Sequence, residues 1–146
     1  MGKAARAIII EDDKMLVMHR NKHGSQYYTL VGGRVQEGET TEQALVREVK
    51  EETGLKVISA RLVFTEEYDE PYNSQYIYLC EVAPHDDVAI GEASEEGFMN
   101  RVGINIHTPL WVYTNSLAKL QFRTPGLHQA LIDCLKNGFP EEPVKL

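Results

Sequence analysis

Three glutamates on one predicted helix are the residues of this sequence whose type and spacing best suit chemistry. Glu48, Glu51 and Glu52 stand at positions i, i+3 and i+4, so their side chains converge on one patch of a helix. Like charges at this spacing repel each other by about 0.2–0.5 kcal/mol per pair, and a helix C-terminus disfavours anions. A divalent cation reverses this penalty, because hard ions such as Mg²⁺ take oxygen ligands. The three acids therefore predict a metal site.

A glycine-containing loop and the helix itself must position these acids. The loop begins at Gly32 and Gly33, where a short β-prone stretch ends. We expect the helix to begin after an N-cap at Thr40 or Thr41, because a threonine side chain can accept a hydrogen bond from the first helical turn. Gly54 stands where the glycine that commonly ends a helix belongs. The three acids therefore lie near the C-terminal end of this helix.

The remaining elements are predicted from apolar runs, turns and capping residues. We expect a β-hairpin from 6–10 and 15–20, a loop at 21–26, strands at 27–31, 56–68, 75–82 and 110–114, a polar loop at 84–108, and a C-terminal helix that begins at Thr124-Pro125 and ends at Gly138. The chain has 146 residues, the usual size of one domain. The order of elements predicts a single α/β (α+β) domain over 1–146, with a mixed β-sheet flanked by helices.

Composition and charge limit the classes of partner. The net charge of −7 argues against broad nucleic-acid binding through a basic face, so we expect no nucleic-acid partner. The N-terminal apolar stretch at 7–10 is too short for a secretion signal or a membrane span, so we expect a cytoplasmic protein with no membrane partner. Cys80 and Cys134 form no C-x-x-C pair and are expected to be reduced core residues.

A longer motif with fixed spacing surrounds the three glutamates. It consists of Gly33, five residues, Glu39, seven residues, and then Arg47, Glu48, Val49, Lys50, Glu51, Glu52, Thr53, Gly54 and Leu55. This motif resembles the Nudix box, G-x5-E-x7-R-E-U-x-E-E-x-G-U with U a bulky aliphatic residue, and every specified position matches. The approach at 28–33 is also similar to that of the family, with Val31 in place of the usual proline. Gln36 replaces a glutamate that many members carry, which removes one candidate metal ligand.

The resemblance implies a fold, a reaction and a cofactor. The fold is a Nudix-type α/β/α sandwich, and the reaction is hydrolysis of a nucleoside diphosphate linked to another group, with Mg²⁺ or Mn²⁺. By the pattern of the family, Glu48 and Glu52 are metal ligands and catalytic residues, and Glu51 completes the metal site. The backbone carbonyl of Gly32 is a further candidate ligand, since glycine allows a close approach.

Other residues of the box are expected to support these acids. Arg47 lies at i, i+4 from Glu51 and can orient it through an ion pair, which gives Arg47 a catalytic role. Glu39 is expected to brace the loop against the helix, and Gly33 and Gly54 support the motif.

The general base is left open by the resemblance, because members of the family differ in this role. Some use a glutamate of the box and others use one from a distant loop. Glu48 or Glu52 is the first choice here, and Glu95 and Glu96 are the loop candidates for a base or an extra ligand.

Residues outside the box are candidates for substrate contacts. Arg20 and Arg34 are candidates for phosphate contacts, and Tyr28 is a candidate for stacking on a base. The expected partner is a small-molecule nucleotide, and a homodimer is compatible with the family.

Three interpretations of the function remain open. The first is hydrolysis of (deoxy)nucleoside triphosphates or modified nucleotides, including oxidised ones, in the MutT-like manner, which the compact single domain slightly favours. The second is hydrolysis of ADP-ribose or another nucleotide sugar. Pro71 and Tyr72 stand near positions that the family associates with ADP-ribose and with dinucleoside polyphosphates, so their signals cancel. The third is a non-catalytic nucleotide-sensing domain, which would have no reason to retain all the acids of the box.

Overall fold

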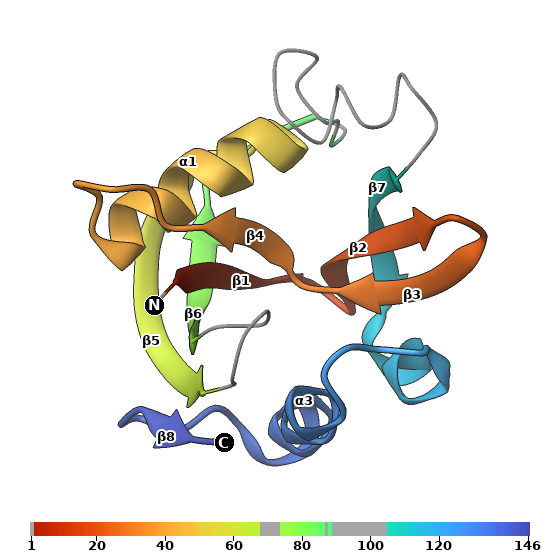
Figure 1. Cartoon of the computed structure of the whole chain (residues 1–146). Coiled ribbons are helices and arrows are strands. Elements are labelled where there is room, and N and C mark those ends of the chain that lie inside the picture. The colour runs from red at the N-terminus through yellow and green to blue at the C-terminus, as the bar shows by residue number, and fades with distance from the viewer. Residues whose placement is uncertain (1, 68–73, 87, 89–104) are drawn as a thin grey trace.

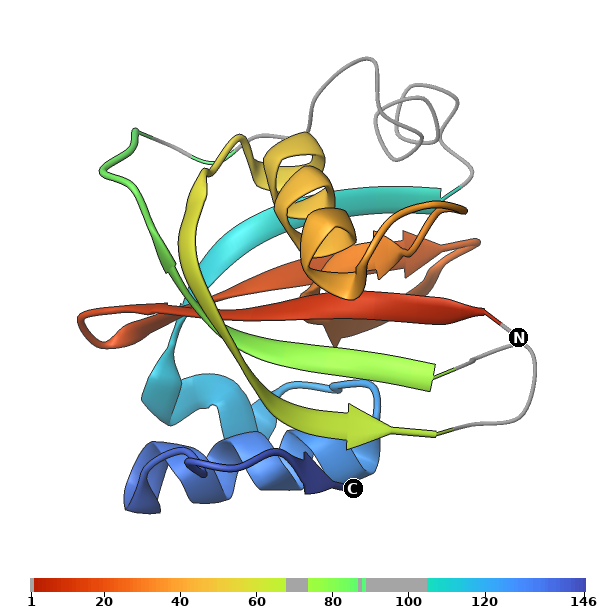
Figure 2. The same cartoon turned by 90° about the vertical axis from the view of Figure 1, so that its left-hand side faces the viewer.

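The computed structural model describes residues 2–67, 74–86, 88 and 105–146 (Figures 1 and 2). Its elements follow one another as β1 (Lys3–Glu11), β2 (Lys14–Lys22), β3 (Ser25–Thr29), β4 (Val31–Arg34), α1 (Thr41–Thr53), β5 (Val57–Glu66), β6 (Ser74–Val82), β7 (Asn105–Tyr113), the 3₁₀ helix η1 (Thr114–Lys119), α3 (Pro125–Asn137) and β8 (Val144–Lys145). The strands form a mixed sheet in the order β3-β2-β1-β6-β5-β8, with β4 paired to β1 and β7 paired to β2. The β1–β6 and β5–β8 pairs are parallel.

Helices cover both faces of this sheet, as Figure 2 shows with α1 on one side and α3 with η1 on the other. Alternation along β1 explains the two layers, because successive side chains of a strand point to opposite faces. Ala5 and Ala7 belong to the apolar core beneath α1, whereas Ile8 belongs to the core beneath α3. The α/β/α arrangement with a mixed sheet therefore agrees with the fold predicted from the sequence.

Helix α1 begins and ends at the predicted residues. Thr40 is the N-cap, and its side chain accepts a hydrogen bond from the backbone N–H of Gln43, whose own side chain accepts one from the Thr40 N–H. This reciprocal pair is a capping box. Gly54 ends the helix with φ 79°, a left-handed conformation that favours glycine. These two caps set the first and last residues of α1.

Two predicted loops are partly strand. The loop expected at 21–26 is a tight hairpin between β2 and β3, in which only His23 and Gly24 turn with positive φ. The loop expected at 84–108 gives way to β7 at Asn105. The start of β7 is hidden in the sequence because polar residues and Pro109 break its apolar alternation, and an edge strand tolerates a proline.

Smaller differences concern the bounds of the strands. The strand expected at 27–31 is divided, because β3 ends at Thr29 and β4 begins at Val31. The strand expected at 56–68 is β5 over Val57–Glu66, and β8 is a two-residue strand that has no apolar pattern to predict it. In the parts of the chain that the structure describes, no helix has the length and apolar character needed to cross a membrane.

Candidate active site

The carboxylate cluster, Glu48, Glu51 and Glu52, lies where the C-terminal half of α1 packs against β1 and β4. Glu48 and Glu52 are buried, with 7% and 3% of their surface exposed, whereas 40% of the Glu51 side chain is exposed. Two carboxylates of one helix are therefore taken out of water while the third remains at the surface. Burial of ionised acids is costly unless partners or a cation compensate, so this position needs a chemical explanation.

Strand β4 accommodates the two buried carboxylates through consecutive glycines. The Gly32 N–H donates to Glu52 Oε2 at 3.0 Å. A Cβ at Gly33 would lie 2.5 Å from Glu48 Cδ, so only glycine leaves room for that carboxylate. Gly32 has φ 139°, and a Cβ there would lie 2.0 Å from the carbonyl oxygen of Ala5. The glycine pair is therefore required both by the backbone and by the acids packed on it.

Arg47 connects the cluster to the loop that precedes α1. Its Nε and NH2 donate to the two carboxylate oxygens of Glu39 at 2.8 and 3.0 Å, a bidentate pair. NH1 donates to Glu48 Oε1 at 2.8 Å and to Glu51 Oε2 at 3.3 Å. NH2 also donates to the carbonyl of Arg34 at 3.0 Å. The Arg47–Glu51 ion pair and the bracing contact of Glu39 that the sequence predicts are both present.

The Arg47–Glu39 pair dominates the electrostatics of this loop. Hydrogen bonds from Arg47, and next from the backbone N–H of Gln36, lower the pKa of Glu39 to about 2. The hydrogen bond to Glu39 is also the main cause that raises the pKa of Arg47 above its ordinary value, with Glu48 adding to it. Both groups are therefore charged at neutral pH, and the loop is fixed against α1.

The donor atoms of the cluster suit a hard divalent cation. Carboxylate oxygens are the ligands that Mg²⁺ takes in phosphate-processing sites, and NH1 of Arg47 brings Glu48 and Glu51 together. Within the described residues, however, no three acids, histidines or cysteines gather closely enough to hold a metal. The Glu52 carboxylate is turned to the Gly32 N–H, and the Gly32 carbonyl accepts from Arg6 NH1 at 3.1 Å. The metal-ligand roles of Gly32 and the three glutamates therefore remain predictions.

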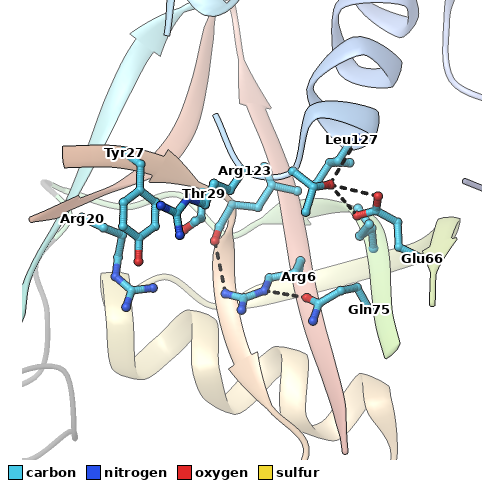
Figure 3. A pocket seen from close by; sticks show the side chains of 11 residues that line it. Arg6, Arg20, Tyr27, Thr29, Glu66, Gln75, Arg123 and Leu127 are labelled. Carbon is cyan, nitrogen blue, oxygen red and sulfur yellow. Dashed lines mark hydrogen bonds between the residues drawn. The ribbon is translucent and has the colours of Figure 1, made fainter. Parts of the chain in front are cut away.

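A cavity of about 170 Å³ lies on the α3 side of the sheet (Figure 3). We call it the arginine pocket, and it is lined by Arg6, Arg20, Tyr27, Thr29, Leu30, Glu66, Gln75, Ile77, Arg123, Thr124 and Leu127. Arg6 Nε donates to Gln75 Oε1 at 3.1 Å, and the Thr124 hydroxyl lies 2.9 Å from Glu66 Oε2. The pocket is linked to the carboxylate cluster through Gly32, whose carbonyl accepts from Arg6 NH1 and whose N–H donates to Glu52.

The predicted substrate contacts are separated by the fold. Arg20 lines the arginine pocket. Tyr28 lies beside His19, with ring centroids 5.0 Å apart, and packs against the core beneath α3. Arg34 is exposed and offers its backbone carbonyl to Arg47. Glu95 and Glu96 lie outside the described residues, as do the two positions associated with substrate, Pro71 and Tyr72.

Several pocket residues were missed by sequence reasoning. Arg6, Glu66, Gln75 and Arg123 come from distant segments, so no spacing joins them. One signal was available, since Arg6 is a charged residue within the otherwise apolar stretch of β1. A charge at such a position is rarely buried without a partner or a function.

Fold and site define the class of protein first: an α/β/α domain with a carboxylate site built by a glycine pair and a helix. Comparison with known proteins then identifies the family. The family model of the NUDIX domain matches residues 1–111. The chain belongs to the Nudix hydrolase family, a family of pyrophosphohydrolases.

Several known proteins are similar to this chain in sequence or in fold. The chain is 35% identical over 80 residues to the NAD-capped RNA hydrolase NudC of Klebsiella pneumoniae (strain 342), an alignment that covers 55% of this chain and 31% of the relative. It therefore spans about a third of the length of that relative. A MutT structure, from a study of Aliivibrio salmonicida and Vibrio cholerae, superposes with a TM-score of 0.68 at 23% identity, over 90% of this chain and 97% of the other. An ADP-ribose pyrophosphatase from Streptococcus suis 89-1591 gives a TM-score of 0.62 at 20% identity, over 99% and 96%.

Proposed function

We propose that this chain hydrolyses a pyrophosphate bond in a nucleoside diphosphate linked to another group, with Mg²⁺ as cofactor. The observation that carries the proposal is the burial of Glu48 and Glu52 against the consecutive glycines Gly32 and Gly33. Burial of two neighbouring ionised acids is costly, and a cation that they bind or a reaction that they serve accounts for that cost. Family membership supplies the reaction class, and the acid-rich box matches it.

Glu48, Glu51 and Glu52 would hold the metal through their carboxylate oxygens. A bound Mg²⁺ supplies charge neutralisation at the phosphates and lowers the pKa of a water. The chain itself contributes orientation, because Arg47 fixes Glu48 and Glu51 while the Gly32 N–H fixes Glu52. Carboxylates that are fixed in this way can hold the metal and the substrate in the orientation that the reaction needs.

The chemical step needs a base among the same acids. A carboxylate of Glu48 or Glu52 takes a proton from the attacking water, whose oxygen bonds to one phosphorus atom. The bridging P–O bond breaks, and its electron pair leaves with the departing phosphate.

The arginine pocket is the site that we propose for the remainder of the nucleotide. It is linked to the carboxylate cluster through Gly32, which contacts both Arg6 and Glu52, and its three arginines supply positive charge for an anionic nucleotide. Modified nucleotides and (deoxy)nucleoside triphosphates are the first substrate class, in accord with the MutT-like fold. A nucleotide sugar or an NAD-type dinucleotide is the second, supported by the identity with NAD-capped RNA hydrolases.

A panel of nucleotides tests this function. Purified protein with Mg²⁺ should release phosphate, pyrophosphate or a nucleoside monophosphate from at least one of the following: nucleoside triphosphates, oxidised triphosphates, ADP-ribose and NAD⁺. A chelator should abolish the release, and added Mg²⁺ or Mn²⁺ should restore it. Absence of turnover across the panel, together with tight nucleotide binding, would instead indicate the non-catalytic sensing domain.

A further inference from the structure

The arginine pocket has an excess of positive charge that cleavage of a pyrophosphate at the carboxylate cluster does not explain. Its lining contains three arginines, Arg6, Arg20 and Arg123, and one carboxylate, Glu66. The whole chain carries a net charge of −7, so this concentration of guanidinium groups runs against its composition. A cavity lined by one sign of charge attracts ligands of the other sign.

Two of the arginines are held on the faces of one tyrosine rather than by acids. The Cζ atom of Arg123 lies 3.9 Å from the centroid of the Tyr27 ring, and that of Arg20 lies 5.5 Å from it. Both distances are within the range of a cation–π interaction. Figure 3 shows the guanidinium groups of Arg20 and Arg123 close to Tyr27. This contact occupies the face of a guanidinium and leaves its N–H edge for an acceptor.

The hydrogen-bonding capacity of these two arginines is not used within the described residues. Neither side chain makes a hydrogen bond or an ion pair there, and Arg20 Nε is buried without a partner. Arg6 differs, because its N–H groups donate to Gln75 and to the carbonyls of Leu30 and Gly32. Arg6 therefore stabilises the pocket wall through its hydrogen bonds, and Arg20 and Arg123 are the groups that can bind a ligand.

The positive charges of Arg20 and Arg6 also act on a neighbouring histidine. His107 stands opposite Arg20 in the β2–β7 pair and is buried. Burial first, and then the charges of Arg20 and Arg6, lower its pKa to about 4, against the hydrogen bond with the Asn105 carbonyl. The carboxylate of Glu66 lies at the other end of the pocket in Figure 3, where the hydroxyl of Thr124 donates to it.

The scissile phosphates themselves belong at a different place. The carboxylate cluster lies on α1, at one face of the sheet, whereas Leu30, Ile77 and Leu127 of the pocket belong to the core beneath α3. When the pyrophosphate binds at the cluster, Arg20 and Arg123, which lie beside Tyr27, are therefore available to bind another part of the substrate. Bidentate N–H donors on a guanidinium match the oxygens of a phosphate monoester.

We propose that Arg20 and Arg123, held by Tyr27, bind a phosphate that the substrate carries outside its scissile pyrophosphate. The preferred substrates are then nucleotides with an additional phosphomonoester, such as one on the ribose. This inference rests on the proposed function, since it names the substrate class of the same site.

Matched substrate pairs test the inference. NADP⁺ against NAD⁺, and coenzyme A against dephospho-coenzyme A, differ only by one ribose phosphate. We expect kcat/KM to be at least about tenfold higher for the phosphorylated member of a pair. Arg123→Gln, a change at an exposed position, should remove that preference by lowering kcat/KM about tenfold more for the phosphorylated member than for the other. Arg123→Lys should restore part of it, because the positive charge is retained.

Controls separate the possible outcomes. Lys119→Gln removes one positive charge at an exposed position away from the pocket and should leave the preference unchanged. Equal kcat/KM for both members, or equal losses for both in Arg123→Gln, would overturn the inference, because the arginine would then serve the scissile phosphates or the base. Arg20→Gln should repeat the Arg123→Gln result wherever its thermal unfolding matches that of the wild type.

A binding measurement distinguishes failure of this inference from failure of the proposed function. Calorimetry with adenosine 2′,5′-bisphosphate and with AMP compares the same pair without turnover. Tighter binding of the bisphosphate that is lost in Arg123→Gln supports the phosphate site even if no substrate is hydrolysed. Equal binding of the two nucleotides refutes the phosphate site even if the panel shows an active hydrolase.

Discussion

The carboxylate cluster and the arginine pocket are linked through one residue, Gly32, but are built in different ways. All three acids of the cluster come from the last two turns of α1. The pocket takes its side chains from β1, β2, β3, β5, β6 and α3, from the link between β3 and β4, and from the segment that leads into α3. Gly32 joins the two regions, since its N–H donates to Glu52 and its carbonyl accepts from Arg6.

The difference concerns which part of the function each region determines. One short segment contains the acids, their arginine and their glycines, so the reaction can be specified by a motif. The pocket is specified only by the fold, and its residues can change one at a time without disturbing the motif. We infer that reaction and substrate preference are separable in this chain, and the following variants test that separation.

Glu52→Gln should have the largest effect on catalysis. The amide oxygen of glutamine can still accept a hydrogen bond from the Gly32 N–H. The amide cannot, however, bind a cation or take a proton as a carboxylate does. We expect kcat to fall about 10³-fold with unchanged circular dichroism. Glu37→Gln, an exposed glutamate of the loop, is the matched control and should keep full activity. Full activity of Glu52→Gln would show that the cluster is not the reaction site.

Alanine at the two glycines of β4 should separate stability from catalysis. Gly32→Ala places a Cβ 2.0 Å from the Ala5 carbonyl, which cannot move, so we expect a loss of more than about 3 kcal/mol in the free energy of unfolding. Gly33→Ala instead meets the carboxylate of Glu48, the flexible end of a side chain. It should cost about 1 kcal/mol of stability but lower kcat about 100-fold, because Glu48 is displaced. Urea unfolding and initial rates measure both, and an active Gly33→Ala variant would contradict the role of Glu48.

Arg47→Lys should have an intermediate effect. Lysine keeps the charge but cannot make the bidentate contact with Glu39 while also holding Glu48 and Glu51. We expect kcat to fall about 10- to 100-fold with little change in KM. Lys50→Arg, an exposed conservative exchange on the same helix, should change neither. A rise in KM with unchanged kcat would contradict this role, because it would show that Arg47 contacts the substrate instead of positioning Glu48 and Glu51.

Acid should weaken the two regions in different pH windows, and this is the smallest effect. The folded-state pKa of His107 is lowered to about 4, so the unfolded chain binds its proton first and stability falls as pH decreases from 6.5 toward 4. The pKa of Glu39 is lowered to about 2, so its contribution is complete above 4.5 and is lost as pH falls through 2. Urea unfolding across this range should show a smaller loss above pH 4 in His107→Gln and a smaller loss below pH 4.5 in Glu39→Gln. Identical pH profiles for both variants and the wild type would refute these assignments.

Local sequence signals predicted the box and its helix because their determinants are neighbours in the chain. Thr40 and Gly54 cap α1 through contacts of three or four residues, and the acids follow the helical period. The start of β7 was not predicted, because Asn105 to Pro109 gain their strand conformation from pairing with β2, which is remote in sequence.

The arginine pocket could not be predicted for the same reason. Tyr27 and Arg123 meet only because the segment before α3 runs beside β3, where the Tyr28 N–H donates to the Gln121 carbonyl. Neither the spacing nor the composition of the sequence contains that contact. Arg20 was a candidate by residue type alone, and its neighbours became visible only in the folded chain.

Metal binding tests the central claim, that the carboxylate cluster is a cation site for pyrophosphate cleavage. Electron paramagnetic resonance of Mn²⁺ titrated into the protein counts bound ions without requiring a substrate. The account predicts that the wild type and Arg123→Gln bind Mn²⁺ alike, whereas Glu48→Gln and Glu52→Gln weaken binding at least about tenfold. Mn²⁺ binding that is unchanged by both glutamate substitutions would contradict the claim.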